Sequence, residues 1–348
     1  MVYSPPGRKL HNSTHRSGLS LFNSYMISGA DMGLIELAFA FVLDLAIGDP
    51  QWSYHPVRLI GRSIDGMECL VRKLPIPERV RGILLTMTIV SGTYLVTHAV
   101  VLFSRQYSAL GEMIMGAVII YSAISVKSLA DESKKVMTAL KENDLIKARK
   151  ALSLIVGRDT VNLTQEQIVR ACVETVAEGS VDGVLSPLFY AVVGGPTAAM
   201  AYRAVNTLDS MVGHKSEKYI RFGWASARLD DVANYIPARI SAVLISAASF
   251  LCGYGFKNSL RIACRDGRKH ESPNSGIPEA AVAGALGIQI GGTSTYQGEI
   301  VEKPFIGDAK NPLTANSIDA AIKILYVTSM LFVLCGIGIT LCLKYCCF

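Results

Sequence analysis

The sequence predicts an all-α, polytopic integral membrane protein with about four to six transmembrane or re-entrant helices and cytoplasmic helical loops. Of its 348 residues, 50% are hydrophobic and only 18% carry charge, against roughly 25% in an ordinary soluble domain. Three apolar blocks can cross, or nearly cross, a hydrocarbon core of about 30 Å, and they occupy residues 83–103, 109–126 and 324–343. The middle block contains one charged residue, Glu112, and the other two contain none.

The chain divides into a short tail and one large domain. Residues 1–30 are rich in Ser, His, Arg and Gly and are expected to form a flexible tail, whereas residues 31–348 are expected to form a single integral membrane domain. Residues 32–47 are a fourth apolar candidate, and Glu36 and Asp44 within them predict either a packed helix or a helix that serves a site. Apolar residues near a period of 3.6 predict a helical segment over about 127–175.

Basic residues set the expected orientation, and two irregular apolar segments then raise a difficulty. Residues 127–166 are rich in Lys and Arg, so this segment is expected in the cytoplasm. Residues 184–202 are interrupted by Pro and Gly, and residues 240–256 are near the short limit for a span. If both crossed fully, the polar stretch between them would lie outside the cell. We therefore predict that at least one of them is broken or re-entrant.

An acidic stripe precedes the first of these segments. Glu174, Glu178 and Asp182 are spaced four residues apart, so a helix would place them on one face. Carboxylate oxygens suit Mg²⁺, which usually keeps bound phosphates and waters. The stripe predicts a magnesium site for a nucleotide, and a solvated helix face is the alternative.

Polar residues also concentrate between residues 201 and 239, where donors and acids are mixed. The members of this set are Arg203, Asn206, Asp209, His214, Lys215, Lys218, Arg221, Arg228, Asp230, Asp231 and Asn234. Such a mixture favours a phosphate-bearing ligand beside metal-chelating acids. A basic stretch that binds lipid headgroups is the alternative, but it does not account for the acids and amides.

Two smaller clusters complete the candidates. His55 follows Asp49 in an extended turn after residue 48, and is either an acid/base group or a hydrogen-bonded structural residue. Residues 272–278, which include Ser275, form a polar turn before a helix of small residues, whose N-terminal amides suit an anion. Glu279 near the start of that helix is explained equally well as a complement to the helix dipole.

The sequence also excludes several classes of function. The net charge of +6 is mild and no Lys/Arg run is dense, so no nucleic-acid partner is expected. The chain has no GxxxxGK[ST], GxGxxG, HExxH or GxSxG motif. The residues by themselves therefore predict a polytopic membrane protein with a cytoplasmic-face site for phosphate plus metal.

Several long strings resemble the adenosylcobinamide-phosphate synthase family of cobalamin biosynthesis, also called CbiB or CobD. They are DLAIGDPQWSYHPVRLIGR, VGRDT, ETVAEGSVDGVLSPLFYAVVGG, AYRAVNTLDSMVGHKSEKYIRFGWASARLDDVANYIPAR and HESPNSGIPEAAVAGALGIQIGG. The resemblance covers about residues 44–308, in the family's order. It implies a membrane-embedded, ATP- and Mg²⁺-dependent enzyme that joins aminopropanol or its phosphate to a propionate carboxylate of adenosylcobyric acid.

With that resemblance, each candidate residue takes a hypothetical role. The catalytic candidates are Asp182, Asp209, His55 and His214. The candidates for binding ATP or the phosphorylated amine are Arg203, Asn206, Lys215, Lys218, Arg228 and Ser275. The candidate metal ligands are Glu174, Glu178, Asp182, Asp230 and Asp231. The expected location is the cell membrane, with the active site facing the cytoplasm.

Other functions stay open at this point. Interrupted apolar segments with polar ends also describe secondary transporters of small anionic or phosphorylated metabolites. A scaffold that tethers soluble corrin enzymes is a third class, and it would have no turnover. The expected partners are the corrinoid acid, the amine and membrane lipid, with room for a homo-oligomer or for contact with other corrin-pathway enzymes.

Overall fold

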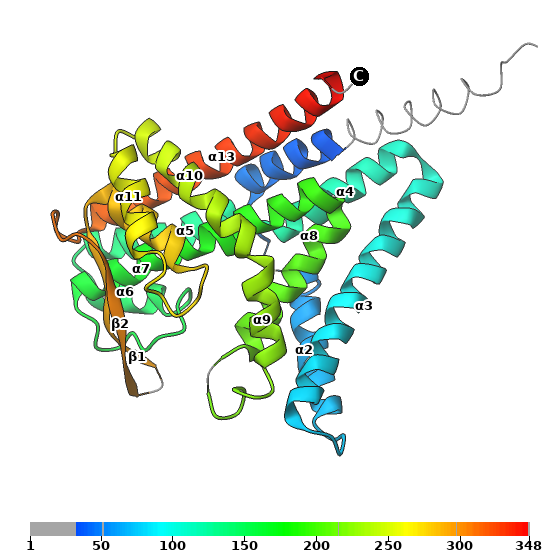
Figure 1. Ribbon diagram of the computed structural model, residues 1–348, viewed down its shortest axis with the longest axis horizontal. Helices are drawn as coiled ribbons and strands as arrows, with labels where there is room; N and C mark the ends of the chain where they lie inside the picture. The colour runs from blue at the N-terminus through cyan, green and yellow to red at the C-terminus, as the bar shows by residue number, and fades with distance from the viewer. Residues whose placement is uncertain (1–32, 51, 215, 297, 347–348) are drawn as a thin grey trace, which may run out of the picture.

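The computed structural model describes residues 33–50, 52–214, 216–296 and 298–346, and most of them are helical (Figure 1). The predicted tail and Lys215 lie outside the described residues. A first helix covers residues 33–47. The other elements, in chain order, are α2 (Pro56–Val71), α3 (Glu78–Tyr107), α4 (Ala109–Ala123), α5 (Val126–Lys141), α6 (Leu145–Leu152), α7 (Gln165–Ser180), the π-helical turn η1 (Val181–Leu185), α8 (Ser186–Val212), α9 (Trp224–Ala233), α10 (Tyr235–Leu251), α11 (Phe256–Asp266), α12 (Gly276–Leu286), β1 (Gln289–Tyr296), β2 (Glu299–Gly307) and α13 (Ala315–Cys346).

Four helical runs among the described residues are long and apolar enough to cross a membrane, or five if the bent pair α9 and α10 forms one span. They are Glu78–Tyr107, Ala109–Lys141, Gln165–Val212 and Ala315–Ile339. In α3 only 22% of the most apolar stretch is buried inside the protein, and Leu95, Val96 and Phe103 are each about 60% exposed. An apolar surface of this kind suits lipid, and the predicted fold class is confirmed.

The helix over residues 33–47 is packed against its neighbours, which explains its charges. The carboxylate of Asp44 accepts hydrogen bonds from the backbone N–H groups of Val126 and Lys127, at 3.0 and 3.2 Å, and so stabilises the start of α5. Glu36 lies directly against Gly116 of α4, where a Cβ atom would meet its carboxylate at 2.6 Å. Of the two alternatives for this helix, the contacts favour packing.

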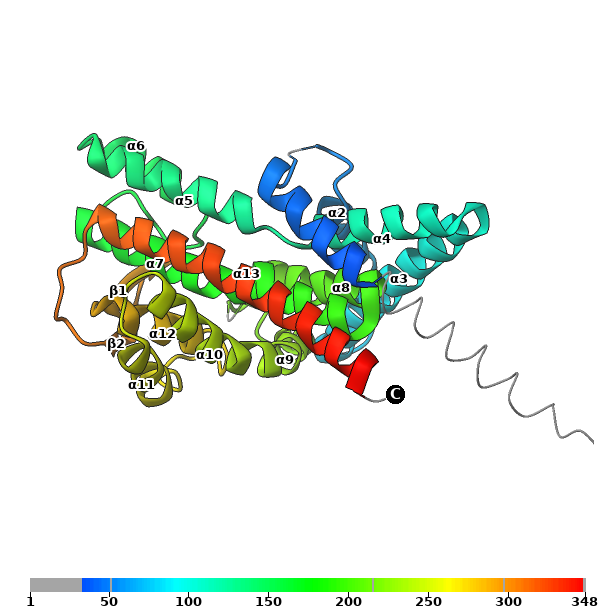
Figure 2. The same ribbon diagram turned by 90° about the horizontal axis from the view of Figure 1, so that it is seen from above.

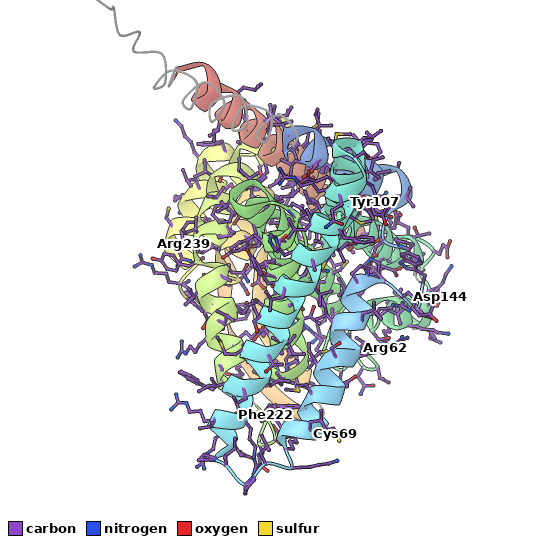
Figure 3. The ribbon with its side chains drawn as sticks, turned by 90° about the vertical axis from the view of Figure 1, so that its right-hand side faces the viewer. Arg62, Cys69, Tyr107, Asp144, Phe222 and Arg239 are labelled. Carbon is purple, nitrogen blue, oxygen red and sulfur yellow. The ribbon has the colours of Figure 1, made fainter. Side chains whose placement is uncertain are left out.

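Helices α2 and α3 form a pair, and the N-terminal end of α3 contacts the chain segment just before α9 (Figure 3). The two helices pack side by side, and Phe222 lies at the opposite end of α3 from Tyr107. Gly82 permits this contact, because a Cβ atom there would lie 1.7 Å from the carbonyl oxygen of Phe222. The guanidinium of Arg72 stacks over the Phe222 ring at 4.2 Å.

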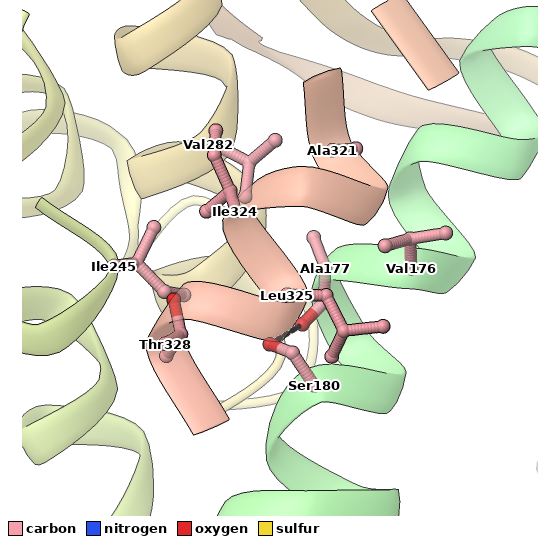
Figure 4. Close-up of a pocket in the computed structure, with 9 residues that line it drawn as sticks. All are labelled: Val176, Ala177, Ser180, Ile245, Val282, Ala321, Ile324, Leu325 and Thr328. Atoms are coloured by element: carbon pink, nitrogen blue, oxygen red, sulfur yellow. Dashed lines mark hydrogen bonds between the residues drawn. The ribbon is translucent and has the colours of Figure 1, made fainter. Parts of the chain in front are cut away.

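Helix α13 crosses the molecule and packs against α5, α7, α10 and α12 (Figure 2). Its inner face meets Val176 of α7, Ile245 of α10 and Val282 of α12 through Leu325 and neighbouring residues (Figure 4). The small pocket that these residues line has no room for a water molecule, as is usual for a core. These contacts fix α7, which carries Glu174 and Glu178, and α12, which carries Glu279.

The predicted break in the segment over residues 184–202 is present. Helix α8 loses helical geometry at Gly194 and Gly195, directly before Pro196. Gly195 has φ 69° and ψ −165°, a conformation that is essentially restricted to glycine. Pro196 has no N–H for the preceding turn, so the break falls where the backbone cannot continue a helix.

The chain reverses direction at this break. The rings of Tyr190 and Tyr202, from opposite sides of it, stack with centroids 5.2 Å apart. The hydroxyl of Tyr202 also donates to the carbonyl oxygen of Asp182 at 3.4 Å. A straight helix would separate those two residues by roughly 30 Å. The reversal therefore extends only about 17 Å beyond Asp182, about half of a hydrocarbon core, as the re-entrant interpretation requires.

The one departure from the all-α expectation, within the described residues, is the antiparallel hairpin of β1 and β2. The end of the hairpin opposite its turn is held by Asp266 of α11. The Asp266 carboxylate accepts the N–H of Gly307 at 2.9 Å and pairs with Arg265 and Lys269 at 2.6 and 2.7 Å. Burial opposes ionisation of Asp266, but these hydrogen bonds hold its pKa well below the usual range. The hairpin is therefore attached to the helical body at a charged network.

Replacing Gly195 should test the reversal. Gly195→Ala forces a side chain onto a backbone conformation that L residues rarely adopt, which costs about 1–3 kcal/mol. No atom lies within 4 Å of the added Cβ position, so the whole effect is backbone strain. We expect a lower thermal unfolding midpoint for the purified protein in detergent.

Gly92→Ala is the matched control, since Gly92 lies inside α3 and also has open space at its Cβ position. This change should be neutral or stabilise the helix by up to about 1 kcal/mol. Equal midpoints for the two variants would contradict the strained reversal.

Candidate active site

The reversal of α8 brings three polar segments onto one buried amide. The hydroxyls of Ser186 and Tyr202 both donate to Oδ1 of Asn234, at 2.6 and 2.8 Å. The Nδ2 group of Asn234 donates to Oδ2 of Asp230 at 2.9 Å. Asn234 is only 1% exposed, so these bonds form away from competing water. They join both arms of α8 to the junction of α9 and α10.

Three carboxylates and one guanidinium meet beside this amide. Asp182 interacts electrostatically with Asp209, Asp230 and Arg203, and Nη1 of Arg203 donates to the carbonyl oxygen of Asp182 and to Oδ1 of Asn206, at 3.4 and 3.3 Å. Asp182, Asp209, Asp230 and Arg203 are called the acidic cluster below. All four are half-buried, so the cluster is neither a solvated helix face nor a sealed core.

Several polar atoms of the acidic cluster have no protein partner. Oδ1 of Asp230 and Nε of Arg203 are buried and make no hydrogen bond. The carboxylates of Asp182 and Asp209 also accept no hydrogen bond from any described residue. Carboxylates kept this close repel one another and are costly to bury unpaired. The arrangement therefore favours a bound cation or a ligand with several donors.

The π-helical turn η1 places Asp182. Its wide turn exposes the carbonyl oxygen of Gly183, which accepts the backbone N–H of Ser125 at 3.0 Å. A Cβ atom on Gly183 would lie 2.8 Å from Oγ of Ser125, so this close approach depends on glycine. Turns of this kind are frequent at functional sites. Here the turn separates Asp182 from the regular α-helical face that carries Glu174 and Glu178.

The predicted acidic stripe is consequently divided between two places. Glu174 is directed toward the β-hairpin, where it pairs with Arg158 at 2.6 Å and accepts the N–H of Gly291 at 2.9 Å. Asp182 belongs to the acidic cluster. Glu178 lies between them, because it interacts electrostatically with Asp182 and Asp230 and also with Glu279.

The predicted histidines lie at different distances from this centre. His214 interacts electrostatically with Asp209. His55 is buried and pairs through Nε2 with Asp49 at 2.9 Å. Asp49 in turn interacts with Arg203, so His55 reaches the acidic cluster only through an intervening carboxylate.

The remaining predicted residues are partly engaged elsewhere. Lys218 lies 3.5 Å from Glu68 of α2, and Arg228 lies 3.4 Å from Asp231. The N–H of Ser275 donates to the hydroxyl of Ser272 at the start of α12. The structure thus brings Asn206, Asp209 and His214 to the acidic cluster and gives Lys218 and Ser275 other contacts.

A second charged group lies under the hairpin, and the sequence analysis did not predict it. It combines Arg158, Glu174, His270, Glu279 and Lys303, which interact electrostatically with one another, and it is called the hairpin cluster below. Burial, the largest cause, lowers the pKa of His270 against the opposing effect of nearby carboxylates. Lys303 is on β2, and nothing in its local sequence indicates a site.

The donor set of the acidic cluster fits a magnesium ion in chemical type. Among the described residues, no group of three or more His, Cys, Asp or Glu side chains is arranged as a ready metal site. Mg²⁺ is usually held by one or two carboxylates together with phosphate oxygens. Asp182 and Asp230, with its unpaired Oδ1, match that pattern, whereas Glu174 is already neutralised by Arg158.

The fold and these contacts define a class: a multi-pass, mostly helical membrane protein with a half-buried acidic site at the base of a broken helix that reverses direction. The family model described as CobD/Cbib protein matches residues 37–325. The chain belongs to this family of cobalamin biosynthesis proteins.

Curated relatives match most of their own length. The cobalamin biosynthesis protein CobD of Clostridium perfringens is 48% identical over 299 residues, which cover 86% of this chain and 95% of that protein. CobD of Geobacter metallireducens is 47% identical, covering 85% and 93%. The cobalamin biosynthesis protein CbiB of Salmonella choleraesuis is 45% identical, covering 86% and 95%. No solved structure matches the chain.

Proposed function

We propose that this protein is an ATP-dependent amide ligase that joins aminopropanol, or its O-phosphate, to a propionate carboxylate of adenosylcobyric acid. The observation that carries the proposal is the acidic cluster, where half-buried carboxylates that lie beside Arg203 keep oxygen atoms without a protein donor. Membership of a cobalamin biosynthesis family supports the substrate class. The proposed location is the cell membrane, with the cluster facing the cytoplasm.

The chemistry explains why phosphate and acid groups are needed together. Direct condensation of a carboxylate with an amine is unfavourable in water, so the propionate would first be activated by ATP. A carboxylate oxygen forms a bond to the γ-phosphorus as the bond from that phosphorus to ADP breaks, which gives an acyl phosphate and releases ADP. The amine nitrogen then forms the C–N bond as the C–O bond to phosphate breaks, and inorganic phosphate leaves. These two reaction steps require that the negative charge on the phosphoryl group is stabilised and that protons are removed from the amine nitrogen.

The residues of the acidic cluster have roles in this scheme. Arg203, with its buried unpaired Nε, would stabilise the charge on the transferred phosphoryl group. Asp182 and Asp230 would hold Mg²⁺, which when bound neutralises phosphate charge. His214, beside Asp209, would accept a proton from the amine. Lys215, Lys218 and Arg228 are proposed as further phosphate contacts.

A secondary transporter is the second candidate, because a broken apolar helix with polar ends is a feature of that class. Turnover distinguishes the two functions. We expect the purified protein to hydrolyse ATP only when adenosylcobyric acid and the amine are both present, with one phosphate released per amide formed. ATP-independent uptake of the amine by proteoliposomes, without amide product, would instead support transport.

Loss of either central carboxylate should abolish the reaction. Asp182→Asn and Asp209→Asn should each lower kcat roughly 100-fold or more, because they remove charge where phosphate and metal meet. Asp131→Asn is the control, since Asp131 is 45% exposed and forms only a surface pair with Lys134, and it should change the rate less than about twofold. Full activity of both cluster variants in the amide-forming assay would refute these assignments.

The re-entrant arrangement also predicts a topology. An epitope tag inserted after Ser216, in the connection between α8 and α9, should be accessible only from the cytoplasm. The same tag at Ser108, between α3 and α4, should be accessible from outside. Labelling of intact cells at the Ser216 position would show that the acidic cluster does not face the cytoplasm.

A further inference from the structure

Glu279 is a buried carboxylate without a partner. It lies in the first turn of α12 and is only 5% exposed. Within the part of the chain that the structure describes, its side chain forms neither a hydrogen bond nor an ion pair. Helix α12 is otherwise apolar, and small residues pack it closely against α10 and α11. A charge in such a place is costly unless something compensates it.

The neighbouring cations do not supply that compensation. Arg158 is committed to Glu174, at 2.6 Å, and its other amino group donates to Ser294 at 3.3 Å. Lys303 lies beside the ring of Tyr296, with its Nζ atom 5.7 Å from the centroid. Both cations influence Glu279 only from beyond ion-pair distance. Burial, Glu174 and Glu178 all raise the pKa of Glu279, so its ionised form lacks a compensating cation.

His270 does not fill this gap. Its Nδ1 atom accepts the backbone N–H of Ser272 at 3.0 Å, so the proton of the neutral ring is on Nε2. Burial lowers the pKa of His270, which keeps the ring neutral near pH 7. His270 therefore offers the surroundings of Glu279 a neutral donor, and no positive charge.

Glu178 connects the surroundings of Glu279 electrostatically with the acidic cluster. The Glu178 carboxylate interacts with Asp182, Asp209 and Asp230 on one side and with Glu279 and His270 on the other. A ligand that compensates Glu279 would therefore lie beside the place where phosphate is proposed to be transferred. Of the proposed substrates, the amine is the one that carries a positive charge in water.

We propose that Glu279 and Glu178 bind the primary ammonium group of the amine substrate, and that the hairpin cluster forms the amine subsite of the enzyme. This inference rests on the ligase function proposed above. A primary ammonium group has three donors, which matches two carboxylates that lack donors of their own. The remaining donors of Lys303 and His270 would then serve the oxygen-bearing end of the same small molecule.

The test separates amine binding from activation of the carboxylate. Hydroxylamine is uncharged near pH 7, and it traps an acyl phosphate as a hydroxamate without needing an ammonium site. In Glu279→Gln we expect the KM for aminopropanol or its phosphate to rise roughly 10- to 100-fold, as loss of a charged hydrogen bond predicts. Hydroxamate formation from ATP, adenosylcobyric acid and hydroxylamine should stay within about twofold of the unmodified enzyme.

Glu302→Gln is the matched control, because Glu302 is an exposed carboxylate next to Lys303 on the same strand, and both reactions should be unchanged in it. Glu279→Asp keeps the charge on a shorter arm and should give an intermediate KM, which tests the assignment if the Gln variant does not fold. Equal loss of the amine and hydroxylamine reactions, or an unchanged KM for the amine, overturns the subsite.

These outcomes are distinguishable from failure of the proposed function. If the unmodified protein gives neither amide nor hydroxamate in the presence of ATP, the ligase proposal itself is wrong. If it gives both, and Glu279→Gln behaves like Glu302→Gln, only the amine subsite is wrong.

Discussion

The site depends on a single buried side chain, the amide of Asn234. A chain that reverses inside an apolar region must have its polar groups satisfied by protein, because lipid offers no hydrogen bonds. Asn234 accepts from Ser186 before the reversal and from Tyr202 after it, and it donates to Asp230. Each of these groups would lose a hydrogen bond without it, and such losses are expensive in a buried network. The acidic cluster therefore exists where it does because α8 returns to this amide.

Part of this arrangement could be predicted from the sequence because local chemistry determines it. Gly194, Gly195 and Pro196 interrupt an apolar segment, and both residue types disrupt helices through well understood backbone effects. The membrane helices were equally predictable, since long uncharged blocks have few other solutions. Asp209 and Asp230 were identified because their segment mixes acids with donors in a way that a lipid-binding stretch does not require.

Other features could not be predicted because they depend on distant contacts. Residues 289–296 contain Gly291 and Gly292, both at positive φ, and they form a strand only through pairing with residues 299–307. The stripe of Glu174, Glu178 and Asp182 assumed a regular α-helix. The π-helical turn directs Asp182 into the acidic cluster, while the bond from Gly291 draws Glu174 toward the hairpin. Neither effect is visible in the spacing of the acids.

The unpredicted hairpin and the predicted stripe turn out to be parts of one electrostatic arrangement. Gly291 of β1 donates to Glu174, and the same carboxylate holds Arg158, so both groups are occupied within the protein. That pair is closed, and burial together with Glu174 and Glu178 raises the pKa of Glu279. A cationic ligand beside Glu279 would therefore stabilise its ionised form. The acidic cluster, in contrast, retains Arg203 as its only nearby cation among the described groups that interact with Asp182. Arg203 keeps an unpaired Nε atom at the phosphate end, whereas Arg158 at the hairpin end is already paired with Glu174. The two clusters therefore favour ligand groups of different charge, which a ligase for an anion and an amine requires.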